Sequence, residues 1–234
     1  MTNQKTIQWN AQRTRSLLNK KFGVPHTLAT IKHFQSVLYR INFATDRINR
    51  AKHELDNEIK TVAELDDLHA IMFSASELSG DFDNSMYVIN RELIAAVHDI
   101  HCIPDCLAQG LAMSAKVSTL TKEYANGVVK YFKKNNIPLT KGLENIITSQ
   151  AFLHLREISN KSKHSAIISS PLSASNVNFT NGIPDHKIIF DSLNGFPRVD
   201  AVPFMESLID FTVENLKTVG EEVDTYLEGL PDAA

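Results

Sequence analysis

The sequence has few of the features that mark membrane-spanning or disulfide-bonded proteins. It contains two cysteines in 234 residues, which is too few for a disulfide framework. No apolar run approaches the roughly 20 residues that cross a bilayer. The N-terminal sequence Met-Thr-Asn-Gln-Lys is polar and lacks the apolar core of a signal peptide. We therefore expect a cytoplasmic protein that does not enter a membrane.

Motifs of several common enzyme classes are also missing. There is no glycine-rich phosphate loop, no Gly-x-Ser-x-Gly and no His-Glu-x-x-His. The adjacent carboxylates Asp66-Asp67 and Glu221-Glu222 point apart on a helix, so neither pair makes a two-carboxylate site. We therefore expect no cofactor and no metal.

One set of residues has the chemistry of zinc ligands. His98, Cys102 and Cys106 are spaced four apart. On one straight helix the outer two are about 12 Å apart, which is too far to surround one ion. We interpret His98 as a core histidine beside two small thiols.

The net charge of −3 conceals a strong segregation of charge along the chain. Residues 1–60 carry 11 Lys/Arg against 4 Asp/Glu, and residues 116–164 carry 9 against 3. Residues 61–115 and 200–234 are acidic, each with 1 Lys/Arg against 9 Asp/Glu. These segments can neutralise each other inside one fold. Alternatively, the two basic segments share one face and attract phosphate groups.

Helical periodicity dominates the sequence. Apolar residues recur every seven positions from Phe34 to Val62 without an intervening Gly or Pro, which predicts one long helix over 27–62. Such a seam packs inside an intramolecular bundle, which we favour, or against a second chain in a coiled coil. Other helical patterns cover 63–79, 85–107, 117–132, 140–164 and 200–228.

Local signals predict where these helices are interrupted. Residues 81–84 have the composition of a turn, and Pro104 predicts a kink or break near 100–103. Thr140 is placed to cap the helix over 140–164. Residues 186–190 read as a strand.

Together these patterns predict a mainly α fold, a helical bundle with a small β-hairpin before the C-terminal helix. We expect a single domain over 1–234. Its predicted parts are N-terminal helices, helices that carry the candidate site, a hairpin or loop arm and a last helix, at 1–80, 85–164, 165–195 and 200–228.

The densest polar cluster lies at the end of the helix predicted over 140–164. Arg156, Asn160 and His164 are four apart and form one stripe on a helix, flanked by Lys161 and Lys163. Arg stays charged while His titrates near neutrality, so the set suits a phosphate clamp beside a proton-transfer group. In this hypothesis Arg156 and the lysines hold a phosphodiester, and His164 moves a proton during attack by a ribose 2′-hydroxyl. Alternatively, these cations only stabilise a solvated helix C-terminus.

This arrangement resembles the HEPN superfamily of helical domains, and in particular bacterial HEPN-like proteins with an Asn-x-x-Lys-His element. Here Asn-Lys-Ser-Lys-His at 160–164 precedes the apolar Ala-Ile-Ile at 166–168 and a final long helix. The resemblance implies a metal-independent ribonuclease, often dimeric and often part of a toxin–antitoxin, CRISPR or antiphage system. It assigns Arg156, Asn160 and His164 as catalytic residues and places His98 or Asp99 as supports for Arg156.

The spacing of the motif departs from the usual HEPN pattern. The family commonly separates Arg from His by four to six residues, whereas seven lie between Arg156 and His164. Members with altered motifs are taken as binding or dimerisation modules. Two hypotheses follow. The first is an RNA-binding protein or ribonuclease. The second is a catalytically silent helical module whose partner is a second copy or another protein.

Overall fold

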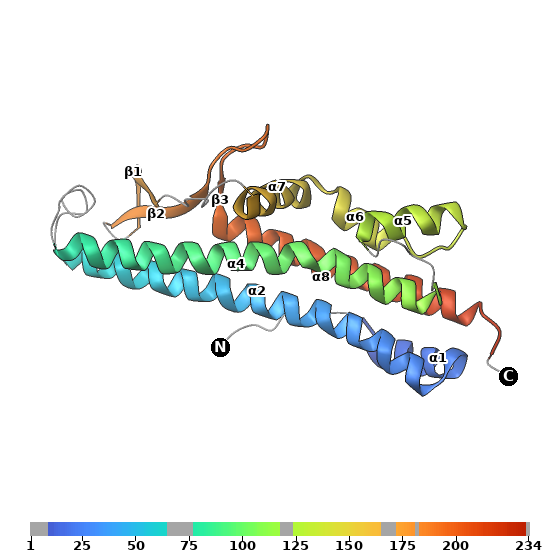
Figure 1. Ribbon diagram of the computed structural model, residues 1–234. Helices are drawn as coiled ribbons and strands as arrows, with labels where there is room; N and C mark the ends of the chain where they lie inside the picture. The colour runs from blue at the N-terminus through green and yellow to red at the C-terminus, as the bar shows by residue number, and fades with distance from the viewer. Residues whose placement is uncertain (1–8, 65–76, 118–123, 165–171, 181–182, 233–234) are drawn as a thin grey trace. The chain divides into compact units, whose positions relative to one another are not determined.

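The computed structural model describes residues 9–64, 77–117, 124–164, 172–180 and 183–232, and these residues form a mainly α fold (Figure 1). The helices of the described residues are α1 (Ala11–Phe22), α2 (Val24–Glu64), α4 (Glu77–Ser114), α5 (Ala125–Lys134), α6 (Lys141–Thr148), α7 (Gln150–His164) and α8 (Ala201–Glu228). The strands are β1 (Leu172–Thr180), β2 (Ile183–Phe190) and β3 (Val199–Asp200). β1 and β2 form an antiparallel hairpin, and the short β3 pairs with β2. The predicted helical fold with a hairpin before the last helix is confirmed.

The residues group into two compact units that are each discontinuous in sequence. Unit 1 comprises Met1–Ile41, His101–Leu153 and Ser207–Ala234, and unit 2 comprises Asn42–Ile100 and His154–Glu206. α2, α4, α7 and α8 each contribute residues to both units. The predicted single domain over 1–234 stays a prediction.

The long helix predicted from the seven-residue repeat is present as α2. The repeat positions Phe34, Ile41, Ile48 and Leu55 are all buried, none more than 9% exposed. A helix of this length gains most of its stability from such a packed face. In contrast, Leu38, which lies outside this repeat, is 38% exposed. One row therefore belongs to the core, as the intramolecular interpretation requires.

α4 is continuous across the predicted turn at 81–84 and across Pro104, so neither predicted site ends a helix. The helix continues through 81–84, because Phe82 is buried there and the Ser85 hydroxyl donates to Glu54 Oε1 at 2.8 Å instead of capping a new helix. The helix also continues through Pro104, between the buried residues Ile103 and Leu107. Core packing outweighs the local turn and helix-breaking preferences at both places. The pattern predicted over 63–79 lies mostly outside the described residues.

The helix predicted over 140–164 is two helices, α6 and α7, which are separated at Ser149. Ser149 has an extended backbone, and its Oγ accepts from the backbone N–H of Phe152 at 3.2 Å, so it caps the first turn of α7. Thr140 precedes α6 as predicted but makes no side-chain cap. Instead the Glu222 carboxylate of α8 accepts from the backbone N–H groups of Lys141 and Gly142, at 2.9 and 3.0 Å.

Gly142 marks a close approach of α6 to α8 within unit 1. A Cβ placed there would lie 2.5 Å from Val219 Cγ2 and 3.0 Å from the Val219 backbone nitrogen. We expect Gly142→Ala to lower the free energy of unfolding by about 1–3 kcal/mol, because backbone atoms cannot move aside cheaply. Urea unfolding followed by circular dichroism measures this change.

Gly80 supplies the matched control for that substitution. It lies within α4, and a Cβ there meets nothing within 4 Å. Gly80→Ala should raise the free energy of unfolding by about 0.5–1 kcal/mol, since only the backbone entropy of the unfolded chain changes. The proposed close approach is wrong if Gly142→Ala unfolds at the same urea concentration as the Gly80→Ala protein.

Candidate functional site

The C-terminal half of α7 presents the predicted polar stripe to solvent. The Arg156 side chain is 41% exposed, and Asn160, Lys161 and Lys163 are also exposed. On the opposite side of the helix, Leu155, Ile158 and Ser159 are fully buried and anchor α7 in its unit. The backbone of His164 ends α7. Its side chain lies outside the described part of the structure.

Acidic groups neutralise these cations only weakly. Arg156 Nε lies 3.9 Å from Glu157 Oε1, and an exposed pair at that distance contributes little to stability. The other oxygen of Glu157 accepts from Asn194 Nδ2 at 2.9 Å. Of the carboxylates that the structure describes, none forms an ion pair with Lys161 or Lys163. The end of α7 therefore carries a local excess of positive charge.

The Lys and Arg residues of the N-terminal basic segment differ from those of α7 because several of them form ion pairs. Several of them pair with carboxylates of the two acidic segments, as mutual neutralisation predicts. The pairs are Arg13 with Asp224 and Glu228, Lys20 and Lys21 with Asp232, Arg47 with Glu92 and Asp99, and Lys52 with Glu206. The paired part of this segment therefore has little charge to offer a ligand, in contrast to the end of α7.

His98 of α4 contacts α7 through two serine hydroxyls. Its Nδ1 lies 3.2 Å from Ser159 Oγ, and its Nε2 lies 3.2 Å from Ser162 Oγ. Because the Ser162 hydroxyl donates to the carbonyl oxygen of Ser159 at 2.8 Å, His98 Nε2–H is the donor to Ser162 and the Ser159 hydroxyl donates to Nδ1. This contact orients the last turns of α7. The sequence pattern alone did not identify the two serines as partners.

The two residues of α4 that the resemblance places as supports for Arg156 bind different partners, and that support role stays a prediction. His98 contacts α7 through serines, whereas Asp99 accepts from Arg47 Nε at 3.0 Å. Burial, and then the charge of Lys163, lower the pKa of His98 against the opposing charge of Asp99. The imidazole is therefore neutral at pH 7, as its two hydrogen bonds require.

A second histidine of α7, His154, packs against the tight turn at 193–196. His154 is 3% exposed. Its ring stacks on Phe196 with ring centroids 4.8 Å apart and meets the Phe204 ring at a tilt, with centroids 5.0 Å apart. Phe196 closes a two-residue turn in which Asn194 and Gly195 both have positive φ, the geometry that Asn-Gly favours. Asn194 also reaches Glu157. Two contacts one turn apart on α7 therefore hold this turn.

Other chemistry considered in the sequence finds little support. Cys102 and Cys106 are free thiols, and burial raises the pKa of Cys106. The described residues contain no group of three His, Cys, Asp or Glu side chains placed to hold a metal ion. Among the same residues, no helix has the length and apolarity needed to cross a bilayer.

Comparisons with protein-family models, with curated proteins and with solved structures gave no match to this chain.

The buried ring of His154 should make the protein sensitive to acid. Its Nε2 has no hydrogen-bond partner among the described residues, and burial lowers its pKa below the ordinary value of 6.5. The unfolded chain therefore takes up this proton at a higher pH than the folded chain does. Stability contributed by the neutral ring is complete above pH 6.5 and is lost as the pH falls through the folded-state pKa.

We expect His154→Phe to reduce the loss of thermal stability between neutral and mildly acidic pH, since phenylalanine keeps the stack and cannot be protonated. Melting temperatures at both pH values measure the effect. His53→Phe, at an exposed histidine, is the control and should lose as much stability as the wild type. An equal acid-induced loss in wild type and His154→Phe contradicts the assignment.

Proposed function

We propose that the protein binds RNA through the basic α7 end, which we define as Arg156, Asn160, Lys161 and Lys163. The observation that carries the proposal is their exposure together with the absence of a described carboxylate paired with either lysine. Lys and Arg attract phosphates and release counterions, which supplies most of the affinity of such surfaces. The neighbouring amide of Asn160 can hydrogen-bond a phosphate or a ribose hydroxyl.

The enzymatic form of this proposal is metal-independent cleavage of RNA, as the HEPN resemblance implies. In that reaction the ribose 2′-hydroxyl loses its proton to His164 and attacks the adjacent phosphorus. The bond from phosphorus to the 5′-oxygen breaks, the 5′-oxygen takes a proton from water, and a 2′,3′-cyclic phosphate forms. Arg156 holds a phosphate of the strand, and Asn160 orients the substrate. His98 acts as a positioning residue through Ser159 and Ser162.

The cellular role that goes with this proposed ribonuclease is in a bacterial defence or toxin–antitoxin system.

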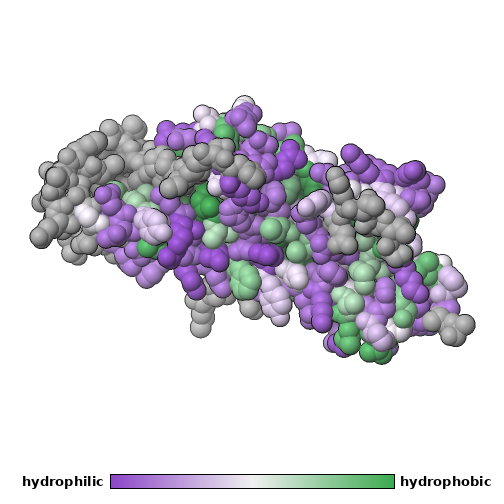
Figure 2. Space-filling model, in the orientation of Figure 1, coloured by the Kyte–Doolittle hydropathy of each residue, from purple (hydrophilic) through white to green (hydrophobic). Residues whose placement is uncertain are grey.

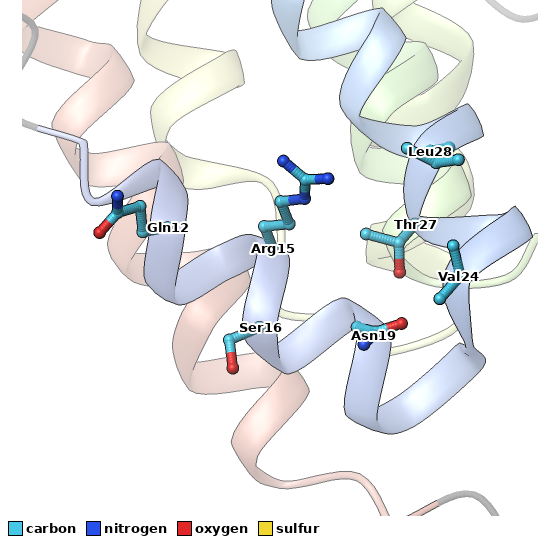
Figure 3. A pocket seen from close by; sticks show the side chains of 7 residues that line it. All are labelled: Gln12, Arg15, Ser16, Asn19, Val24, Thr27 and Leu28. Atoms are coloured by element: carbon cyan, nitrogen blue, oxygen red, sulfur yellow. The ribbon is translucent and has the colours of Figure 1, made fainter.

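A second candidate function is a helical interaction module, and exposed apolar side chains of α2 favour it. Within unit 1, Val24, Leu28 and Tyr39 are 57%, 47% and 59% exposed. Figure 2 shows apolar residues at the surface where α1 and the start of α2 lie. An open groove of about 310 Å³ between these helices continues this surface (Figure 3). Its lining residues are Gln12, Arg15, Ser16, Asn19, Val24, Thr27 and Leu28.

RNA binding is tested by removing charge from α7 and, as a control, from another helix. Lys161→Gln/Lys163→Gln should weaken binding and make the dependence of log affinity on log salt shallower by about 1.4, at about 0.7 per phosphate contact on a single strand. Lys130→Gln/Lys134→Gln removes the same charge from exposed positions of α5 and should change neither quantity. Fluorescence anisotropy at several salt concentrations provides both readouts.

If the α5 and α7 double variants bind RNA equally, the attraction is non-specific and the proposed surface is wrong. Cleavage is tested separately in buffer with EDTA, comparing wild type with Arg156→Ala and His164→Ala. Intact RNA in all three samples rejects the ribonuclease form and leaves the binding proposal to the salt experiment.

The interaction-module candidate is tested by the oligomeric state. If α2 forms the interface, Leu28→Glu should convert a dimer to a monomer in sedimentation velocity, because a charge in an apolar seam costs several kcal/mol when desolvated. Ser36→Glu, at a polar position of the same helix, is the control. A wild-type protein that stays monomeric at high concentration rejects self-association.

A further inference from the structure

α4 presents a stripe of polar and aromatic side chains on one face. Tyr87, Arg91 and His98 are separated by four and seven residues, so they share this face of the helix. His98 binds Ser159 and Ser162, which shows that the face is turned toward α7. The basic α7 end therefore has a neighbouring surface on α4 that the sequence motif did not include.

Arg91 and Tyr87 lie on α4 in the direction in which the end of α7 points. α7 runs antiparallel to α4 (Figure 1), and the contact with His98 is made by its last turns. Two helical turns, about 10 Å, separate His98 from Arg91 along α4. The side chain of Arg91 is 58% exposed, and Tyr87 is 67% exposed.

A buried carboxylate holds Arg91 in place. Glu92 Oε1 accepts from Arg91 Nη2 at 2.8 Å and from Arg91 Nε at 3.2 Å, while the Glu92 side chain is only 5% exposed. The same carboxylate also pairs with Arg47 through Oε2 at 3.3 Å. These contacts occupy one edge of the Arg91 guanidinium. The Arg91 side chain nevertheless stays 58% exposed, so the rest of the guanidinium is accessible to a ligand, and its restraint by Glu92 lowers the entropy lost on binding.

We infer that Tyr87 and Arg91 extend the basic α7 end into a binding surface for single-stranded RNA. One base stacks on the Tyr87 ring, and an adjacent phosphate binds the free edge of Arg91. An exposed aromatic ring beside cations suits unpaired bases, because every base has a face that can stack. Bases inside a duplex are already stacked and paired, so they have no face to offer Tyr87. This inference rests on the proposed RNA binding.

Tyr87→Ala tests the stacking contact. It should weaken binding of an unstructured RNA oligonucleotide by about fivefold or more, and leave the salt dependence unchanged, because no charge is removed. Tyr87→Phe should retain wild-type affinity, since the ring is kept. Tyr124→Ala is the matched control, because Tyr124 is 66% exposed and belongs to unit 1. It should bind as the wild type does.

Arg91→Gln tests the phosphate contact with a different readout. Its salt dependence should be shallower by about 0.7, the value for one phosphate on a single strand. Since this change also removes a partner of the buried Glu92, circular dichroism melting must accompany it. Tyr87→Ala does not have this difficulty, because its side chain is exposed.

The outcomes separate the two proposals. The inference holds if Tyr87→Ala weakens single-strand binding while Tyr87→Phe and Tyr124→Ala do not. If Tyr87→Ala binds normally but Lys161→Gln/Lys163→Gln does not, the α4 extension is wrong and RNA binding by α7 stands. If the wild type prefers duplex to single strand, the inferred ligand is wrong. Failure of the wild type to bind any RNA rejects both proposals.

Discussion

The two buried carboxylates of α4 set the charge arrangement of unit 2. Glu92 and Asp99 lie seven residues apart on one helix face and are 4% and 5% exposed. Ionised groups at such depth need compensating positive charge. Arg47 of α2 supplies it to both, and Arg91 adds a second cation at Glu92. Burial acts to raise the pKa of Glu92, but the hydrogen bonds and charges of Arg91 and Arg47 together outweigh it and lower this pKa. Charge pairing thereby joins α2 to α4.

Because Arg47 and Arg91 compensate these buried carboxylates, Lys161 and Lys163 of α7 are not needed for that purpose. Lys161 and Lys163 extend from a helix that is attached by neutral contacts, namely His98 with Ser159 and Ser162. These neutral hydrogen bonds hold α7 in place without pairing its lysines with carboxylates. This division, with buried acids satisfied by α2 and α4 and exposed cations on α7, is what makes an anionic ligand the best match to the site.

Patterns along the sequence predicted the elements whose signals agree with their packing. The seven-residue repeat identified α2, and the helical pattern over 200–228 identified α8. The start of α4 was missed because turn-forming residues at 81–84 flank Phe82, whose burial depends on the partner helix. The site was predicted only on α7 itself. Contacts from His98, and the shared face with Tyr87 and Arg91, depend on how α4 lies against α7, which residue spacing does not define.

Helix geometry also clarifies what the unusual motif spacing means. Arg156 and His164 are eight positions apart on α7, so their Cα atoms differ by about 12 Å along the axis and about 80° around it. In the proposed ribonuclease, a phosphate at His164 would therefore be far from Arg156, and Arg156 would bind a neighbouring part of the strand. Charge at the cleaved phosphate must come from cations nearer the helix end. Lys163, which directly precedes His164 on α7, is such a cation. Under this proposal, the spacing would separate strand binding by Arg156 from proton transfer by His164 at the end of α7.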